Sequence, residues 1–183
     1  MTQFEFVSVA QSLLCSLIAI RIFSGFVGMH KTIQSYFVYT VWLVLASVSV
    51  TINWWIFWSF RDVDWTYINF LIALCPTFFF YLQAAVLVPT DRSPVTSWRD
   101  YFYEIKNSFF SFLFFYSLAV AATSYFLLDR PILDARRLIN LYMLAVAATG
   151  YLSNNHRVQV AVVVLWSLLI SAGVVGLMSL DLN

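Results

Sequence analysis

The sequence predicts an all-α integral membrane protein, and three observations support that fold class. Hydrophobic residues make up 62% of the 183 residues and charged residues only 10%, with a mean hydropathy of +0.82. Such a composition leaves too little polar surface for a water-soluble domain of this size. Apolar stretches of roughly 20 residues, the length that crosses a bilayer, fill most of the chain. Because they are continuously apolar and lipid cannot satisfy an open sheet edge, we expect them to be helices.

Six transmembrane helices are expected in one polytopic domain, residues 1–183. The expected spans are residues 4–28, 35–60, 65–88, 106–127, 131–152 and 157–180. Glu5 stands where a signal peptide would carry positive charge, so the first helix is expected to stay in the mature protein. An even number of spans places both termini on one side of the membrane.

The basic residues predict which side that is. After the first, third and fifth spans, or near those ends, the chain carries Arg21, Lys31, Arg92, Arg99, Lys106 and Arg157. The opposite side carries Arg61, Arg130, Arg136 and Arg137. Because basic residues favour the cytoplasmic side, this small excess predicts both termini on the non-cytoplasmic side.

Aromatic residues and a proline mark two of the span ends. Trp54, Trp55, Trp58 and Trp65 bracket the short turn at residues 61–64. Such rings settle at headgroup depth, which predicts an aromatic belt. An aromatic cage for a cationic ligand is the alternative, and it requires the rings to converge on one volume. Pro131 suits the first turn of a helix and marks the start of the fifth span.

The one long connection, residues 89–105, is expected to contain a short interfacial helix at about residues 97–105. Ser97 and Asp100 have capping-box spacing, with Asp in place of the usual Glu. The apolar residues that follow recur at helical spacing: Trp98, Tyr101, Phe102 and Ile105. This stripe predicts a helix lying in the acyl boundary, and a docking surface for a soluble partner is the alternative.

Arg21 is the first candidate functional residue, because an arginine in an apolar span costs about 2.5 kcal/mol or more at the bilayer centre. Two interpretations stay open. Its long side chain can snorkel toward the interface or pair with another helix, since Gly28 is only about 10 Å further along the helix. Alternatively, Arg21 belongs to the path of an ion or a small solute.

A polar seam on the first helix is the second candidate feature. At 100° per residue, polar and small side chains share one arc of this helix, among them Ser8, Gln11, Ser12 and Ser16. Ordinary hydrogen bonding between helices explains such a seam, at about 0.6 kcal/mol per contact. The functional alternative is a water-lined path that includes these residues and Arg21.

Pro76 lies in the middle of the third span and removes a backbone hydrogen bond there, which predicts a helix kink. A short repetition links residues 118–125 with 144–151, identical at seven of eight positions. These alanine-rich patches, with Gly173 and Gly176, are interpreted as close-packing surfaces.

The sequence offers little chemistry outside these features. No metalloprotease, nucleophile-elbow or phosphate-loop motif occurs, so an enzyme is not expected, nor is a cofactor or a resident metal. A bis-histidine haem at His30 and His156 is the minor alternative. Cys15 and Cys75 are expected to be apolar free thiols rather than a disulfide. A net charge of +1 gives no reason to expect nucleic acid as a partner.

The layout also carries a resemblance. The Glu-Phe-Val-Ser segment at residues 5–8, the Phe-Ser-Gly segment at residues 23–25 and six compact spans resemble small bacterial inner-membrane proteins of no assigned activity. The resemblance implies a bacterial inner membrane and no particular activity.

Two functions follow as hypotheses. The first is a homo-oligomeric channel or transporter-like protein for an ion or small solute, with Arg21 and the seam nearest the path. The second is a non-catalytic membrane scaffold or regulatory subunit of a larger complex. Beyond the lipid bilayer, the expected partners are therefore further copies of the chain or another membrane protein.

Overall fold

The chain is a helical array in the computed structural model, which describes residues 2–29, 35–90, 95–128 and 136–178. The described elements are α1 (Gln3–Met29), α2 (Phe37–Ile56), the 3₁₀ helix η1 (Phe57–Phe60), α3 (Tyr67–Leu87), α4 (Trp98–Phe126), α5 (Arg136–Leu152) and α6 (His156–Met178). All regular structure in these residues is helical, so the all-α fold class is confirmed for this part of the chain.

Five of the described helices are long and apolar enough to cross a membrane: α1, α2 with η1, α3, α4 and α6. The fifth helix, α5, is shorter, with 17 described residues and an apolar part from Leu138 to Leu152. The expected start of this helix at Pro131 lies outside the described residues. The chain is thus polytopic, while a sixth full crossing by α5 stays a prediction.

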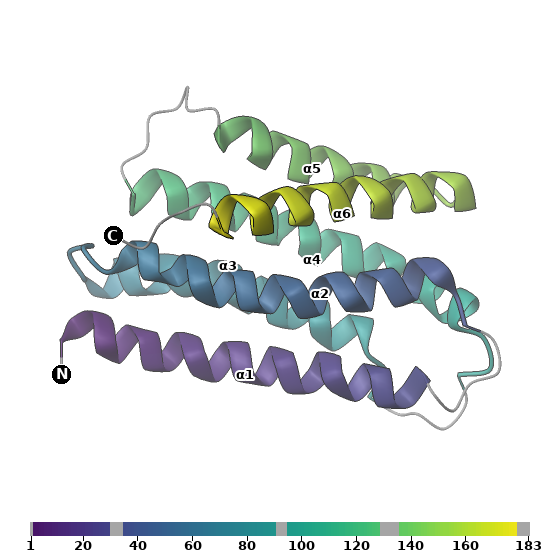
Figure 1. Cartoon of the computed structure of the whole chain (residues 1–183), viewed down its shortest axis with the longest axis horizontal. Coiled ribbons are helices and arrows are strands. Elements are labelled where there is room, and N and C mark those ends of the chain that lie inside the picture. The colour runs from purple at the N-terminus through teal and green to yellow at the C-terminus, as the bar shows by residue number, and fades with distance from the viewer. Residues whose placement is uncertain (1, 30–34, 91–94, 129–135, 179–183) are drawn as a thin grey trace.

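The helices lie roughly side by side along the long axis of the molecule (Figure 1). Helix α3 packs along α4, and α4 packs along α5, while α1 contacts both α2 and α3 and α6 contacts both α2 and α5. Helices α3, α4 and α5 alternate in direction, so the C-terminal ends of α3 and α5 lie at the same end of the bundle. The opposite end carries the start of α1 and the turn after η1.

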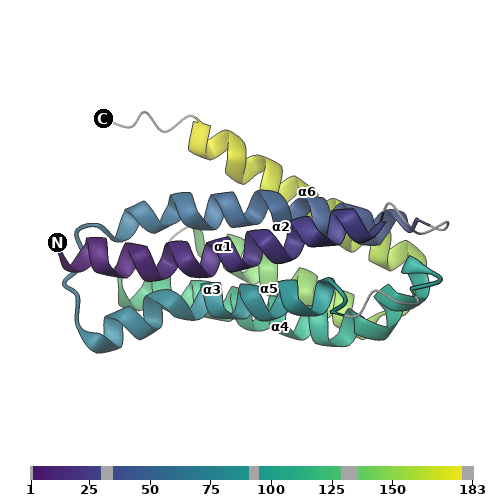
Figure 2. The same ribbon diagram turned by 90° about the horizontal axis from the view of Figure 1, so that it is seen from below.

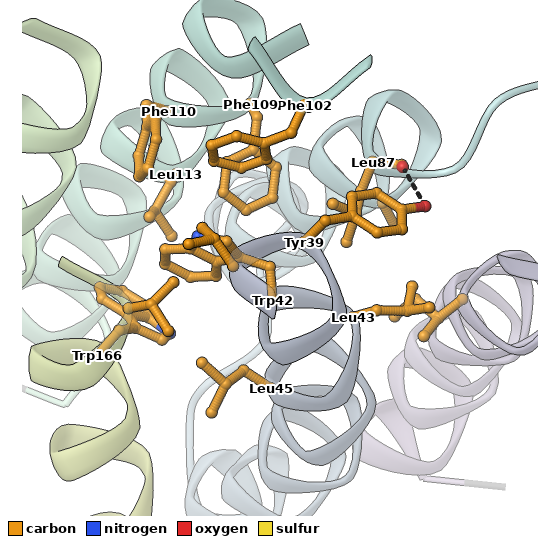
Figure 3. Close-up of a cluster of buried hydrophobic side chains, with 14 of the residues drawn as sticks. Tyr39, Trp42, Leu43, Leu45, Leu87, Phe102, Phe109, Phe110, Leu113 and Trp166 are labelled. Carbon is orange, nitrogen blue, oxygen red and sulfur yellow. Dashed lines mark hydrogen bonds between the residues drawn. The ribbon is translucent and has the colours of Figure 1, made fainter. Parts of the chain in front are cut away.

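Aromatic side chains fill the interior (Figure 3). Trp42 of α2 lies at the centre, with ring-centroid distances of 4.9 Å to Phe109, 5.7 Å to Phe110 and 5.9 Å to Trp166. These contacts join α2, α4 and α6. Because aromatic rings each bury a large area and pack in edge-to-face or tilted pairs, this cluster closes the middle of the bundle to a wide pore within one copy.

The structure corrects the expectation of a separate interfacial helix at residues 97–105. Ser97 does cap a helix, since its Oγ accepts the Asp100 amide at 3.3 Å, but α4 continues without a break to Phe126. Trp98 and Phe102 are fully buried in the core, and Tyr101 and Ile105 are half-buried against it. The aromatic stripe faces the bundle rather than the lipid, because other helices offer it more apolar contact than the interface does.

Two glycines in the bundle allow close helix contacts. A Cβ added at Gly150 would overlap the Phe110 ring, and one at Gly25 would lie 2.9 Å from Val88. Glycine at these positions lets α5 approach α4, and α1 approach the end of α3.

The C-terminal half of α6 leaves the bundle (Figure 2). A Cβ added at Gly173 or Gly176 would meet no atom within 4 Å, and residues 171–173, 175 and 176 are exposed. These glycines are expected to form a close-packing surface, and the described part of the chain leaves space for a side chain at both positions.

Candidate functional site

The Arg21 side chain joins α1 to the C-terminal end of α3. Its Nη2 donates to the Val88 carbonyl at 2.6 Å, to Thr90 Oγ1 at 2.8 Å and to the Ala85 carbonyl at 3.3 Å. Residue 89 is a proline, so it has no amide hydrogen to give the Ala85 carbonyl. The arginine thus supplies donors where the chain lacks them, and its charge faces the negative end of the α3 dipole.

Two tyrosines complete this arrangement. Tyr39 of α2 donates to the Leu87 carbonyl at 3.1 Å, as Figure 3 shows, and Tyr101 of α4 donates to the Val86 carbonyl at 2.9 Å. We call Arg21, Tyr39 and Tyr101 the α3 cap. Its three members come from three helices and satisfy four consecutive carbonyls, those of residues 85–88.

The Trp98 ring supports the α3 cap. It stacks on Tyr39 with a centroid distance of 4.6 Å and an interplanar angle of 17°, and it meets Tyr101 edge-on at 5.8 Å. Trp98 is 2% exposed. The cap is therefore set into the packed core and is not a loose surface contact.

The end of α5 is closed in a similar way. Lys106 of α4 is only 4% exposed, and its Nζ donates to the Tyr151 carbonyl and to Asn107 Oδ1, both at 2.8 Å. Gln159 of α6 donates from Nε2 to the Gly150 carbonyl at 2.8 Å and to the Ser153 carbonyl at 2.7 Å. We call Lys106 and Gln159 the α5 cap. A cation from a neighbouring helix thus lies at the negative end of both α3 and α5.

A buried polar network links α1, α2 and α3 deeper in the bundle. Gln11 Nε2 donates to Asn53 Oδ1 at 2.8 Å, and the Thr77 hydroxyl lies 3.0 Å from Gln11 Oε1 and 3.1 Å from Asn53 Oδ1. The Cys15 thiol lies at the edge, 3.6 Å from Gln11 Nε2. Gln11 and Thr77 are each 1% exposed and Asn53 is half-buried, so most of this network is screened from lipid.

Pro76 leaves a free carbonyl that α4 satisfies. The carbonyl of Ile72 would accept from the amide of residue 76 in a regular helix, and proline has none. The Thr123 hydroxyl of α4 lies 3.3 Å from that oxygen, and 2.8 Å from the Ala119 carbonyl of its own helix. Helix α3 runs from Tyr67 to Leu87 through the proline. The kink itself stays a prediction.

A cavity of about 20 Å³ lies between α2, α3, α4 and α6, a volume that suits one water molecule. Its lining includes Trp42, Ser49, Gln83 and Tyr116. The Trp42 Nε1 is buried and has no hydrogen-bond partner among the described residues. Tyr116 also interacts with Asn53, so the cavity adjoins the buried polar network.

Of the five residues predicted for a path, the structure brings only Gln11 into the buried network. Ser8 and Ser16 each donate within α1, to the carbonyls four residues earlier at 2.7 Å, and Ser16 is exposed on the outer face. Ser12 is half-buried. Arg21 is ten residues from Gln11, roughly 15 Å along the helix. The path through these five residues stays a prediction.

The histidines and cysteines give no assembled centre in the described residues. His156 Nδ1 lies 3.0 Å from the Tyr36 hydroxyl, and His30 lies outside those residues. Cys15 is buried and Cys75 half-buried, and both are free thiols.

Sequence reasoning missed both caps. The tyrosines of the α3 cap carry no local signal, because their acceptors belong to a helix that is distant in the sequence. Pro89 is the signal that was available, since it removes the amide donor opposite Ala85. Lys106 was counted among topology-determining charges, while in the structure it is almost fully buried.

Comparison of the chain with models of protein families, with curated proteins and with solved structures finds no match in any of the three.

Proposed function

We propose that this polytopic membrane protein is a non-catalytic subunit that builds a membrane scaffold, and that copies of the chain pair through the C-terminal half of α6. The observation that carries the proposal is the departure of this half-helix from the bundle (Figure 2). Ala172, Gly173 and Gly176 lie within a 100° arc of it, and a Cβ at Gly173 would meet no atom of the described residues within 4 Å.

The use of glycine elsewhere in the chain supports this pairing. At Gly25 and Gly150, side chains from other parts of the bundle occupy the space that a methyl group would need. Glycine in a helix lowers helix stability by roughly 1 kcal/mol relative to alanine. Close contact with another helix compensates for that loss. Ala172 and Gly176 have the small-xxx-small spacing that brings two membrane helices together. A second copy of the chain fits this face, because in a dimer with twofold symmetry the same surface patch of both copies meets at the interface.

The tightly packed interior supports a scaffold more than a pore within one copy. The rings around Trp42 fill the centre, and the cavity there has room for about one water molecule. Arg21 and Lys106 lie away from this centre, where they cap the C-terminal ends of α3 and α5.

Cysteine cross-linking in native membranes tests the pairing. In a background with Cys15→Ser and Cys75→Ala, Gly173→Cys should form a disulfide-linked dimer on mild oxidation. The matched control is Leu168→Cys, which is 61% exposed and lies about 140° away around the same helix. Dimer from Gly173→Cys and little from the control supports the proposal. Equal cross-linking at both positions, or none at Gly173 in a correctly inserted protein, overturns it.

A second candidate function is an ion or small-solute path, and the buried polar network favours it. Gln11, Asn53 and Thr77 join three helices and adjoin a water-sized cavity. Polar groups buried at membrane depth are expensive and often mark such paths. Because the rest of the interior is packed, this path requires the helices to move apart.

Flux through proteoliposomes tests the second candidate. A path predicts cation or solute flux above empty liposomes and a loss of flux in Gln11→Leu and Arg21→Lys, with Ser16→Ala as the outward-facing control. Absence of flux in correctly folded wild-type protein removes this candidate.

A further inference from the structure

An open cavity of about 1030 Å³ lies between the N-terminal end of α1 and the C-terminal end of α2. We call it the tryptophan groove, and its lining consists of Phe4, Ser8, Thr51, Trp54, Trp55, Phe57, Trp58 and Arg61. Four of these residues, at positions 51, 54, 55 and 58, recur at helical spacing and form one face of α2 and η1. The wall is therefore mostly aromatic.

The groove reaches from the membrane surface into the hydrocarbon. Arg61 follows directly after η1, and Thr51 is ten residues earlier, roughly 15 Å away at α-helical rise. That length is about half of a 30 Å hydrocarbon layer. Tryptophan rings with one polar edge favour the headgroup level. An acyl chain therefore fits along the groove with its headgroup at the Arg61 end.

Charged groups of both signs lie at this end. The Arg61 guanidinium lies over the Trp58 ring, 5.6 Å from its centroid, and Arg61 Nε is 3.3 Å from Asp62 Oδ2. Among the described residues, the two Nη groups of Arg61 have no hydrogen-bond or ion-pair partner. They are thus placed to bind a phosphate, while the Asp62 carboxylate, 84% exposed, can accept from an ammonium group.

The two charges at this end select between lipid classes. Arg61 and Asp62 present one cation and one anion next to each other. A zwitterionic headgroup with a primary ammonium can pair with both side chains, whereas a net anionic headgroup without an ammonium pairs with Arg61 and places its negative charge beside the Asp62 carboxylate. We propose that the tryptophan groove is a binding site for a phospholipid with an ethanolamine headgroup, its phosphate on Arg61 and its ammonium on Asp62.

Native mass spectrometry of the full chain released from nanodiscs tests this site. The nanodiscs contain equal amounts of phosphatidylethanolamine and phosphatidylglycerol. We expect phosphatidylethanolamine to be the retained adduct, and Arg61→Ala or Trp55→Ala to reduce its retention about tenfold, equivalent to about 1.4 kcal/mol. Phe78→Ala is the control, because Phe78 is 50% exposed on α3 and does not line the groove.

Three outcomes would overturn the site. They are equal retention of the two lipids, unchanged retention in Arg61→Ala, and an equal loss in Phe78→Ala. The first would mean that any acyl chain fills the groove, and the last two would mean that the adduct is general boundary lipid. Asp62→Asn adds a readout specific to the headgroup: it should shift retention from phosphatidylethanolamine toward phosphatidylglycerol, and no shift would remove the ammonium contact.

Discussion

The Arg21 guanidinium donates to the Val88 carbonyl at 2.6 Å, the shortest of its three contacts with the end of α3. This bond connects two segments that are 67 residues apart in the sequence. The same guanidinium reaches the Ala85 carbonyl, which Pro89 leaves without an amide donor, and its charge lies at the negative end of the α3 dipole. Of the two roles that the sequence leaves open for Arg21, pairing with another helix matches these contacts, and the solute path stays a prediction.

Replacing Arg21 is expected to destabilise the fold. Arg21→Met should lower the free energy of unfolding by about 1–3 kcal/mol, because hydrogen bonds to charged groups contribute that much and the carbonyls of Ala85 and Val88 would lose their donor. Arg21→Lys keeps the charge but presents a single nitrogen, so it should recover part of the loss. Equilibrium unfolding in mixed micelles measures both. Wild-type stability in Arg21→Met would contradict the role of the α3 cap.

Thr123 and Pro76 are expected to be energetically coupled. Thr123→Val should cost about 1 kcal/mol, because the Ile72 carbonyl loses its donor from α4. In a Pro76→Ala background the alanine amide can bond that carbonyl, so the same substitution should cost less. A double-mutant cycle of unfolding free energies gives the coupling directly. Strict additivity would show that Thr123 does not compensate for the proline.

Gly150→Ala and Gly173→Ala are expected to differ sharply. The first places a methyl group in the space of the Phe110 ring and should lower the free energy of unfolding by about 1–3 kcal/mol through overpacking. The second meets no atom of the described residues within 4 Å and should leave the single copy as stable as before, or slightly more so, because alanine favours helix. Thermal unfolding of the two variants, each at high dilution in detergent, makes the comparison. Similar losses would be inconsistent with the helix contacts described above.

The polar network is expected to contribute through Thr77. Thr77→Val keeps the shape and removes the hydroxyl that bonds Gln11 and Asn53, so it should cost about 1 kcal/mol. Thr51→Val is the matched control, because Thr51 is exposed and donates only to the Val48 carbonyl of its own helix. Unfolding free energies decide the matter, and an equal effect of the two substitutions would count against the network.

The fold class and most helix positions follow from the sequence, because an apolar run of membrane length has few alternatives to a helix. The expected first span, residues 4–28, differs by one residue at each end from α1. The Ser97 cap was also visible, from its spacing to Asp100. The same pattern could not reveal that α4 continues past residue 105, since a stripe of aromatic residues suits a lipid surface and a protein core equally well.

The candidate sites were harder to predict, because their partners are distant in the sequence. The sequence places Gln11 on the polar seam of the first helix, but Asn53 and Thr77 lie on other helices and only the packing brings them together. The side chain of Lys106 looked like a loop charge, and its burial depends on the end of α5. The residues of the predicted seam on α1 also differ in burial, because the neighbouring helices cover only part of it. Gln11 faces inward, while Ser16 is exposed.

The mass of the intact complex, released gently from its native membrane into the gas phase, tests the proposed scaffold most directly. Pairing through α6 predicts a species of two or a larger even number of 21.1 kDa chains, reduced to single chains by a bulky substitution such as Gly173→Trp. A wild-type protein that is only monomeric, or that is present only with a different polypeptide, would contradict the proposal.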